Sequence, residues 1–111
     1  MADLSRGVGV IVVLVTCPSR KVGEELGRTL VGERLAACVN IVPGLTSIYR
    51  WQGKICRDAE ILLVIKTRRT RLPALIPRVR ALHPYSVAEI IALPVLAGSA
   101  PYLSWVREST S

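Results

Sequence analysis

The side chains most able to do chemistry in this 111-residue chain are three cysteines and a single histidine. Cys17 ends an apolar run directly before Pro18, where amide donors at the start of a following helix would lower the pKa of its thiol. The alternative is an inert, half-buried thiol. Cys38 lies in an apolar run typical of a core, and Cys56 falls near an expected hairpin tip.

His83 precedes Pro84 and Tyr85 at the end of an amphipathic stretch. A lone histidine at a helix C-terminus usually acts as a cap, because the helix dipole favours its positive form, and metal ligation is the alternative. A zinc site normally takes three or four protein ligands. A histidine-rich site would therefore need histidines from other subunits.

Catalytic motifs are missing from the sequence. It contains no glycine-rich phosphate loop, nucleophile elbow, CxxC pair or HExxH helix. The basic run from Cys17 to Lys21 stands where an acylphosphatase-like enzyme would have its phosphate loop, but it lacks the glycines of such a cradle. We therefore expect a non-catalytic protein, with a small acylphosphatase-like enzyme as a weaker alternative.

The chain is strongly basic, with a net charge of +7 from 15 basic and 8 acidic residues. The segment 66–80 contains six basic residues and no acidic one: Lys66, Arg68, Arg69, Arg71, Arg78 and Arg80. Such a cluster indicates either a solvated face or an anion-binding face. Without an aromatic platform, such a run predicts only electrostatic contact with nucleic acid and no specific recognition.

A long hairpin is predicted between Leu35 and Thr67, with its reversal at Gln52-Gly53 and Trp51 paired with Lys54. Pro43-Gly44 interrupts the first arm, as a bulge or an edge position would. That arm spans roughly 50 Å, whereas a compact chain of this length is about 35 Å across. The tip, with its aromatic and basic groups, should therefore project and pack against a neighbouring subunit. Nucleic-acid binding is the alternative for this tip.

The remaining elements flank this hairpin. We predict a buried core strand over 9–16, rather than a signal peptide. A helix should then run from the N-cap Ser19 to about Leu35. A second helix capped by Thr70 follows, with a kink or a 3₁₀-like start at Pro77, and then a strand over 87–95 and a short helix over 100–107. The expected apolar faces are Val22, Leu26, Leu30, Val31 and Leu35 in the first helix, and Tyr102, Trp105 and Val106 in the last.

This β-α-β-β-α-β order is typical of the ferredoxin-like α+β fold, an antiparallel sheet with two helices on one face. We expect one domain over 1–111 with a loose N-terminus at 1–8. The odd number of cysteines favours a reduced, cytoplasmic setting. No apolar stretch is long enough to span a membrane.

Four runs of this sequence together resemble the CutA family of divalent-cation tolerance proteins: 33–55, 59–67, 82–95 and 102–106. The resemblance implies a ferredoxin-like subunit in a homotrimer similar to that of PII-type signalling proteins, cytoplasmic in bacteria, with a link to copper and other divalent cations. It also implies a ligand pocket where subunits meet. The residues on the family's motif positions are Trp51, Glu60, Lys66, His83 and Tyr85.

The copper site that the resemblance implies is incomplete here. It uses a cysteine late in the first strand and two histidines before Pro-Tyr, whereas this chain has Val15 and Leu82-His83. His83 is thus the one ligand carried over, with Cys17 displaced by two residues. Ser86 and Ala88 replace a longer polar residue and a proline at the pocket edge.

The sequence therefore predicts a homotrimeric, non-catalytic metal-response protein that binds a divalent cation such as copper or a small anionic ligand. An RNA-binding module of the same fold is the alternative. Such modules need stacking aromatics on the central strands, and the expected strands at 10–15 and 61–65 carry none.

Overall fold

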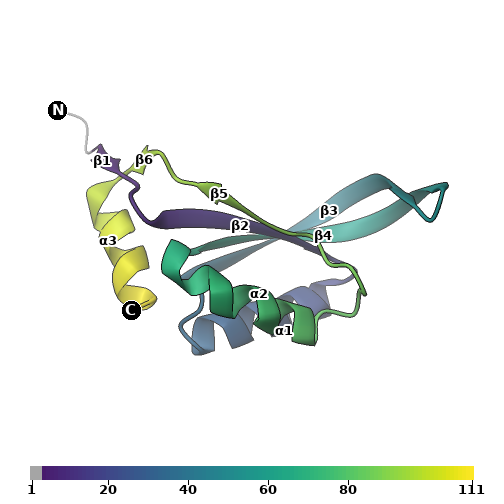
Figure 1. Cartoon of the computed structure of the whole chain (residues 1–111), viewed down its shortest axis with the longest axis horizontal. Coiled ribbons are helices and arrows are strands. Elements are labelled where there is room, and N and C mark those ends of the chain that lie inside the picture. Colours follow the sequence, from purple (N-terminus) through teal and green to yellow (C-terminus); the bar gives the residue numbers. More distant parts are fainter. Residues whose placement is uncertain (1–3) are drawn as a thin grey trace.

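The computed structural model describes residues 4–111 and shows an antiparallel four-stranded sheet covered by two helices on one face (Figure 1). The strands follow the order β3-β4-β2-β5, which is the ferredoxin-like arrangement predicted from the sequence. Their bounds are β2 Val10–Cys17, β3 Cys38–Trp51, β4 Lys54–Arg68 and β5 Ile90–Pro94. The helices α1 Arg20–Gly32 and α2 Leu72–Leu82 lie together beneath the sheet (Figure 1).

The core lies between this sheet and its two helices. Inward-facing residues of the central strands β2 and β4 contact the helices, because side chains of a strand alternate between its two faces. The fully or almost fully buried members are Val13, Val15, Leu63 and Ile65 from the strands and Leu26, Leu30, Leu75 and Val79 from the helices. Helices α1 and α2 leave the opposite face of the sheet uncovered, and α3, Ala100–Ser109, packs only against its end, where Val10 is buried with Leu103 and Val106.

The β3–β4 hairpin forms as predicted. Trp51 pairs with Lys54 across a turn in which Gln52 and Gly53 have φ angles of 50° and 77°, a left-handed pair typical of a tight hairpin reversal. The pairing register shifts between Val42 and Leu45, so Pro43-Gly44 is a bulge. The hairpin projects beyond the helices and gives the molecule its longest dimension of 50 Å (Figure 1).

Helix α1 begins as predicted, with the Ser19 side chain accepting a hydrogen bond from the backbone N–H of Val22 at 3.2 Å. It ends at Gly32, before the predicted end at Leu35, and Val31 is 43% exposed rather than part of the apolar face. Gly23 and Gly27 are buried instead. A methyl group at Gly23 would lie 3.1 Å from Leu63 Cδ2, so these glycines let the helix approach the sheet closely.

Helix α2 begins differently from the prediction. Thr70 makes no capping hydrogen bond; it lies inside a 3₁₀ turn, η1 Arg69–Arg71, that leads directly into α2. Pro77 is accommodated inside the helix. The 3₁₀ turn lies before both prolines of α2, whereas the kink or 3₁₀-like start was predicted at Pro77.

The two ends of the chain meet in a part of the fold that the sequence did not predict. Strand β1, Ser5–Arg6, pairs with β6, Ala97–Gly98, so this part of the predicted loose start over 1–8 is ordered. The rest of that prediction, at 1–3, lies outside the described residues. Helix α3, Ala100–Ser109, follows, and it buries Leu103 and Val106 while Tyr102 and Trp105 remain exposed.

Three arginines hold the carbonyl end of α3. Arg34 donates to the backbone oxygens of Glu108 and Ser111, at 2.7 and 3.1 Å. Arg68 and Arg71 both donate to the backbone oxygen of Thr110. Because cations are favoured at the negative end of a helix dipole, this cluster fixes α3 to the turn after α1, to the end of β4 and to η1. Among residues 4–111, no helix has the length and apolar character needed to cross a membrane.

Candidate functional site

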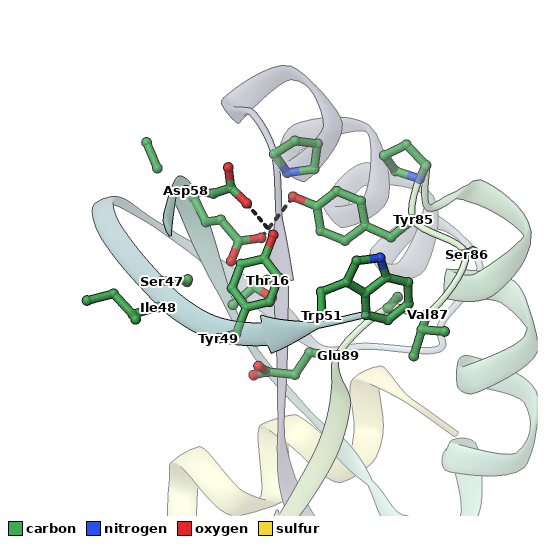
Figure 2. A pocket seen from close by; sticks show the side chains of 15 residues that line it. Thr16, Ser47, Ile48, Tyr49, Trp51, Asp58, Tyr85, Ser86, Val87 and Glu89 are labelled. Carbon is green, nitrogen blue, oxygen red and sulfur yellow. Dashed lines mark hydrogen bonds between the residues drawn. The ribbon is translucent and has the colours of Figure 1, made fainter. Parts of the chain in front are cut away.

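A large hollow lies between the hairpin and the segment 84–89 that leads into β5, with Thr16 at the end of β2 among its lining residues (Figure 2). Its volume is about 940 Å³. Its lining includes three aromatic side chains, Tyr49, Trp51 and Tyr85, and three acidic ones, Asp58, Glu60 and Glu89.

Two tyrosine–carboxylate pairs organise the pocket. Tyr85 donates its hydroxyl hydrogen to Glu60 Oε2 at 2.9 Å, and Tyr49 donates to Asp58 Oδ2 (Figure 2). Asp58 and Glu60 are two positions apart on β4, so both side chains lie on the face of the sheet away from the helices. The pocket is therefore at one end of this open face.

Both tyrosines are held in their neutral form. The hydrogen bond to Asp58 raises the pKa of Tyr49 to about 12. Burial, and then the hydrogen bond to Glu60, raise the pKa of Tyr85 well above its ordinary value. Each phenol keeps its proton because its O–H group donates a hydrogen bond to a carboxylate. A negatively charged phenolate would lose this hydrogen bond and be repelled by the carboxylate.

Three of the predicted ligand-binding residues meet in this pocket: Trp51 from the hairpin tip, Glu60 from β4 and Tyr85 from the loop after α2. Lys66 does not join them in this chain. It stands six residues along β4 from Glu60, on the same open face but roughly 20 Å away, and donates to the side-chain oxygen of Asn40.

His83 lies behind the pocket with only 7% of its surface exposed. Its Nε2 is 2.7 Å from the backbone oxygen of Thr16, and its Nδ1 accepts a hydrogen bond from the backbone N–H of Tyr85 at 3.1 Å. The ring also packs against Tyr85, with 4.7 Å between centroids. Both nitrogens are therefore engaged by the protein itself, and neither presents a lone pair to an incoming ion.

Cys17 is completely buried, and its Sγ donates weakly to the backbone oxygen of Ser19. Burial raises the pKa of this thiol, although the helix start acts in the opposite direction, so the lowered pKa considered from the sequence is wrong. Within residues 4–111, no three His, Cys, Asp or Glu side chains gather closely enough to hold a metal ion. The donors present at His83 and Cys17 thus do not fit the copper site implied by the resemblance.

The sequence analysis missed several pocket residues, among them Tyr49, Asp58 and Glu89. The position of the turn at Gln52-Gly53 could have predicted the contact between Tyr49 and Asp58. This turn pairs Tyr49 with Cys56, so Asp58 is the diagonal neighbour of Tyr49 on the next strand. Glu89 had no such signal, since its place depends on how the loop after α2 crosses the sheet.

Comparison with known proteins gives a consistent result. The family model described as CutA1 divalent ion tolerance protein matches residues 11–109. The divalent-cation tolerance protein CutA of Thermus thermophilus is 59% identical over 99 residues, which cover 89% of this chain and 96% of that protein. A solved structure of the divalent cation tolerance protein of Thermus thermophilus superimposes with a TM-score of 0.90 at 57% identity, covering 92% of this chain and 99% of that one.

The names of other relatives point to different compartments. A chloroplastic CutA of Arabidopsis thaliana is 51% identical over 99% of this chain, which spans 60% of the plant protein's length. A solved structure from Archaeoglobus fulgidus, described as a periplasmic divalent cation tolerance protein, has a TM-score of 0.89 at 32% identity and covers 92% of this chain and 99% of that one.

Proposed function

Because the chain belongs to the CutA1 divalent ion tolerance protein family, we propose that it acts as a homotrimeric, non-catalytic divalent-cation tolerance protein. Its ligand pocket is the hollow between the hairpin and segment 84–89, completed by a neighbouring subunit. The three cysteines are free, which suits a reducing compartment, and we assign the protein to the cytoplasm.

The observation that carries the proposal is the open face of the sheet. It is apolar along most of its length, yet within residues 4–111 only its ends are covered, by α3 at Val10 and by segment 84–89 at the pocket. The side chains on this face include Val12, Leu14, Val42, Leu62, Val64, Ile91 and Leu93, of which Val42, Ile91 and Leu93 are 42%, 51% and 48% exposed. An uncovered apolar surface of this kind is typical of a subunit interface.

The hairpin adds a second reason for assembly. Ile48 and Ile55 near its tip are 70% and 74% exposed, and β3 forms a long edge with no strand of the described chain on its outer side. Such an edge promotes open-ended association unless a closed ring covers it. Three is the number of subunits that the family resemblance implies.

We expect the protein to bind copper only weakly. The engaged nitrogens of His83 and the buried thiol of Cys17 do not fit a built copper site. Cu(II) should therefore bind at scattered surface donors, in the manner expected from its general preference for nitrogen and sulfur ligands.

Light scattering of the purified protein at micromolar concentration tests the assembly. The expected native mass is three times the 12.1 kDa of one chain. An Ile91→Asp variant, which places a charge on the open face, should shift the mass toward one chain. Its control is Val31→Asp, since Val31 is also exposed but lies on α1, away from the open face. A wild-type mass near one chain would overturn the trimer.

A further inference from the structure

The charge lining the pocket is opposite to the charge of the protein. The chain has a net charge of +7, yet the pocket is lined by Asp58, Glu60 and Glu89 and by no lysine, arginine or histidine of the described residues. A small anionic ligand, which the sequence analysis allowed, would meet repulsion there. The lining favours a positively charged group.

Glu60 gives the strongest indication of a missing partner. It is only 8% exposed, and its carboxylate has no basic partner among residues 4–111. Oε2 accepts the hydrogen bond from Tyr85, whereas Oε1 accepts none from a described residue. No fully enclosed side-chain oxygen of the described chain lacks a hydrogen-bond partner, so Oε1 is accessible from outside the protein. Glu60 is one of the residues that line the hollow. A largely buried carboxylate without a positive partner is costly, and a cation in the pocket would relieve this cost.

The walls of the pocket suit an organic cation better than a bare metal ion. Trp51 and Tyr85 are 43% and 37% exposed, and both line the hollow (Figure 2). Aromatic faces attract ammonium and guanidinium groups through their negative π-clouds. A volume of about 940 Å³ is far larger than an ion needs, and no three acidic side chains of the described part come close enough to form a metal cage.

We propose that the pocket binds an ammonium or guanidinium group, which pairs with Glu60 Oε1 and lies against Trp51. This inference deepens the proposed function, because it assigns a ligand chemistry to the same pocket. The group has two conceivable sources. One is a free small molecule; the other is a basic side chain of a second copy, for which Lys54 is suited because it lies at the exposed hairpin tip beside Trp51.

The first arm of the test uses agmatine, which carries both an ammonium and a guanidinium group, in calorimetric titration of the assembled protein. Glu60→Gln should weaken agmatine binding at least tenfold, and Asp58→Asn should weaken it less. The matched control is Glu25→Gln, which removes the same charge from an exposed position on α1. Glutarate, an anion of similar length, should not bind. Melting curves establish that each variant is folded.

The second arm measures self-association of Glu60→Gln, Lys54→Gln and the double variant. If agmatine does not bind, but each single change weakens assembly and the double change adds little, the cation belongs to a second copy. If agmatine binds equally to Glu60→Gln, if glutarate binds more tightly, or if neither arm shows an effect, the inference is wrong. A native mass of one chain together with Glu60-dependent agmatine binding would overturn only the trimer, whereas a trimer without either effect would overturn only the cation pocket.

Discussion

The imidazole Nε2 of His83 lies 2.7 Å from the backbone oxygen of Thr16, a residue 67 positions earlier in the chain. A carbonyl oxygen can only accept, so Nε2 carries the hydrogen, and Nδ1 is left as the acceptor for the N–H of Tyr85. The ring therefore joins the end of β2 to the loop that carries Tyr85 into the pocket. Its role in this structure is to position that loop.

Replacing His83 by alanine should reduce stability while changing Cu(II) binding little. The substitution removes two hydrogen bonds of a buried ring and leaves a cavity, so the free energy of unfolding should fall by about 3 kcal/mol. His83→Gln should recover part of this loss, since its amide can still donate to Thr16. Denaturant unfolding and Cu(II) calorimetry measure the two effects. A tight site of one ion per chain that disappears in His83→Ala would return His83 to the role of metal ligand.

Replacing Trp51 by alanine should weaken assembly and lower the melting temperature together. Burying a large aromatic side chain contributes on the order of 3 kcal/mol, and Trp51 is still 43% exposed in the described chain. Trp105→Ala is the control, because Trp105 is equally exposed, at 43%, but lies on α3. Light scattering and thermal melting make the comparison. A Trp51→Ala protein with unchanged mass and melting temperature would contradict this role.

Two glycines of α1 should respond in opposite directions to alanine. Gly32→Ala should stabilise the protein by up to about 1 kcal/mol, because a methyl group there meets nothing within 4 Å and alanine favours the helix. Gly23→Ala should destabilise it, since the added methyl group would lie 3.1 Å from Leu63 Cδ2 and 3.4 Å from Cys17 Sγ. Urea unfolding of both variants gives the signs. Stabilisation by Gly23→Ala would show that α1 can move away from the sheet.

The tyrosines provide a test at alkaline pH. The pKa values of all three, Tyr49, Tyr85 and Tyr102, are raised, that of Tyr49 to about 12. In the unfolded chain they ionise near pH 10, at about the ordinary value. A raised folded pKa means that the stabilisation is complete below the unfolded value and is lost as the pH rises toward the folded one.

Ultraviolet absorbance of the folded protein should therefore show no phenolate near pH 10, whereas the protein in denaturant should titrate there. Asp58→Asn should bring the pKa of Tyr49 down, because it removes the accepting carboxylate. Tyr49→Phe identifies the titration step of that residue. A folded protein in which Tyr49 or Tyr85 ionises at its ordinary pKa would contradict the arrangement of the two tyrosine–carboxylate pairs.

The sequence was informative where local geometry decides the outcome. Gln52-Gly53 and Pro43-Gly44 each favour a special backbone conformation, so the turn and the bulge were predictable. The start of the first helix was also predictable, because the side chain of Ser19 can accept a hydrogen bond from the backbone N–H three residues later. Thr70 failed as a cap because it lies inside the 3₁₀ turn Arg69–Arg71, which leads directly into α2. Strands β1 and β6 have two residues each and carry no periodic pattern.

The pocket was only partly predictable for a related reason. Alternation along β4 places Asp58 and Glu60 on one face, and hairpin register then brings Tyr49 near Asp58. The contact between Tyr85 and Glu60 depends instead on where the loop after α2 crosses the sheet, which only tertiary packing determines. The same limit applies to α3, whose sequence has apolar residues on both sides and does not reveal that Leu103 rather than Trp105 is buried.

The arginine cluster at the end of α3 has a consequence for the order of folding. Its hydrogen bonds join residues that are 39 to 77 positions apart. Loops of this length close slowly, and neighbouring elements must already be in place to present Arg34, Arg68 and Arg71 together. We therefore expect the sheet and α1 to form before α3 docks, so that α3 is the last element protected in refolding and the first released in unfolding.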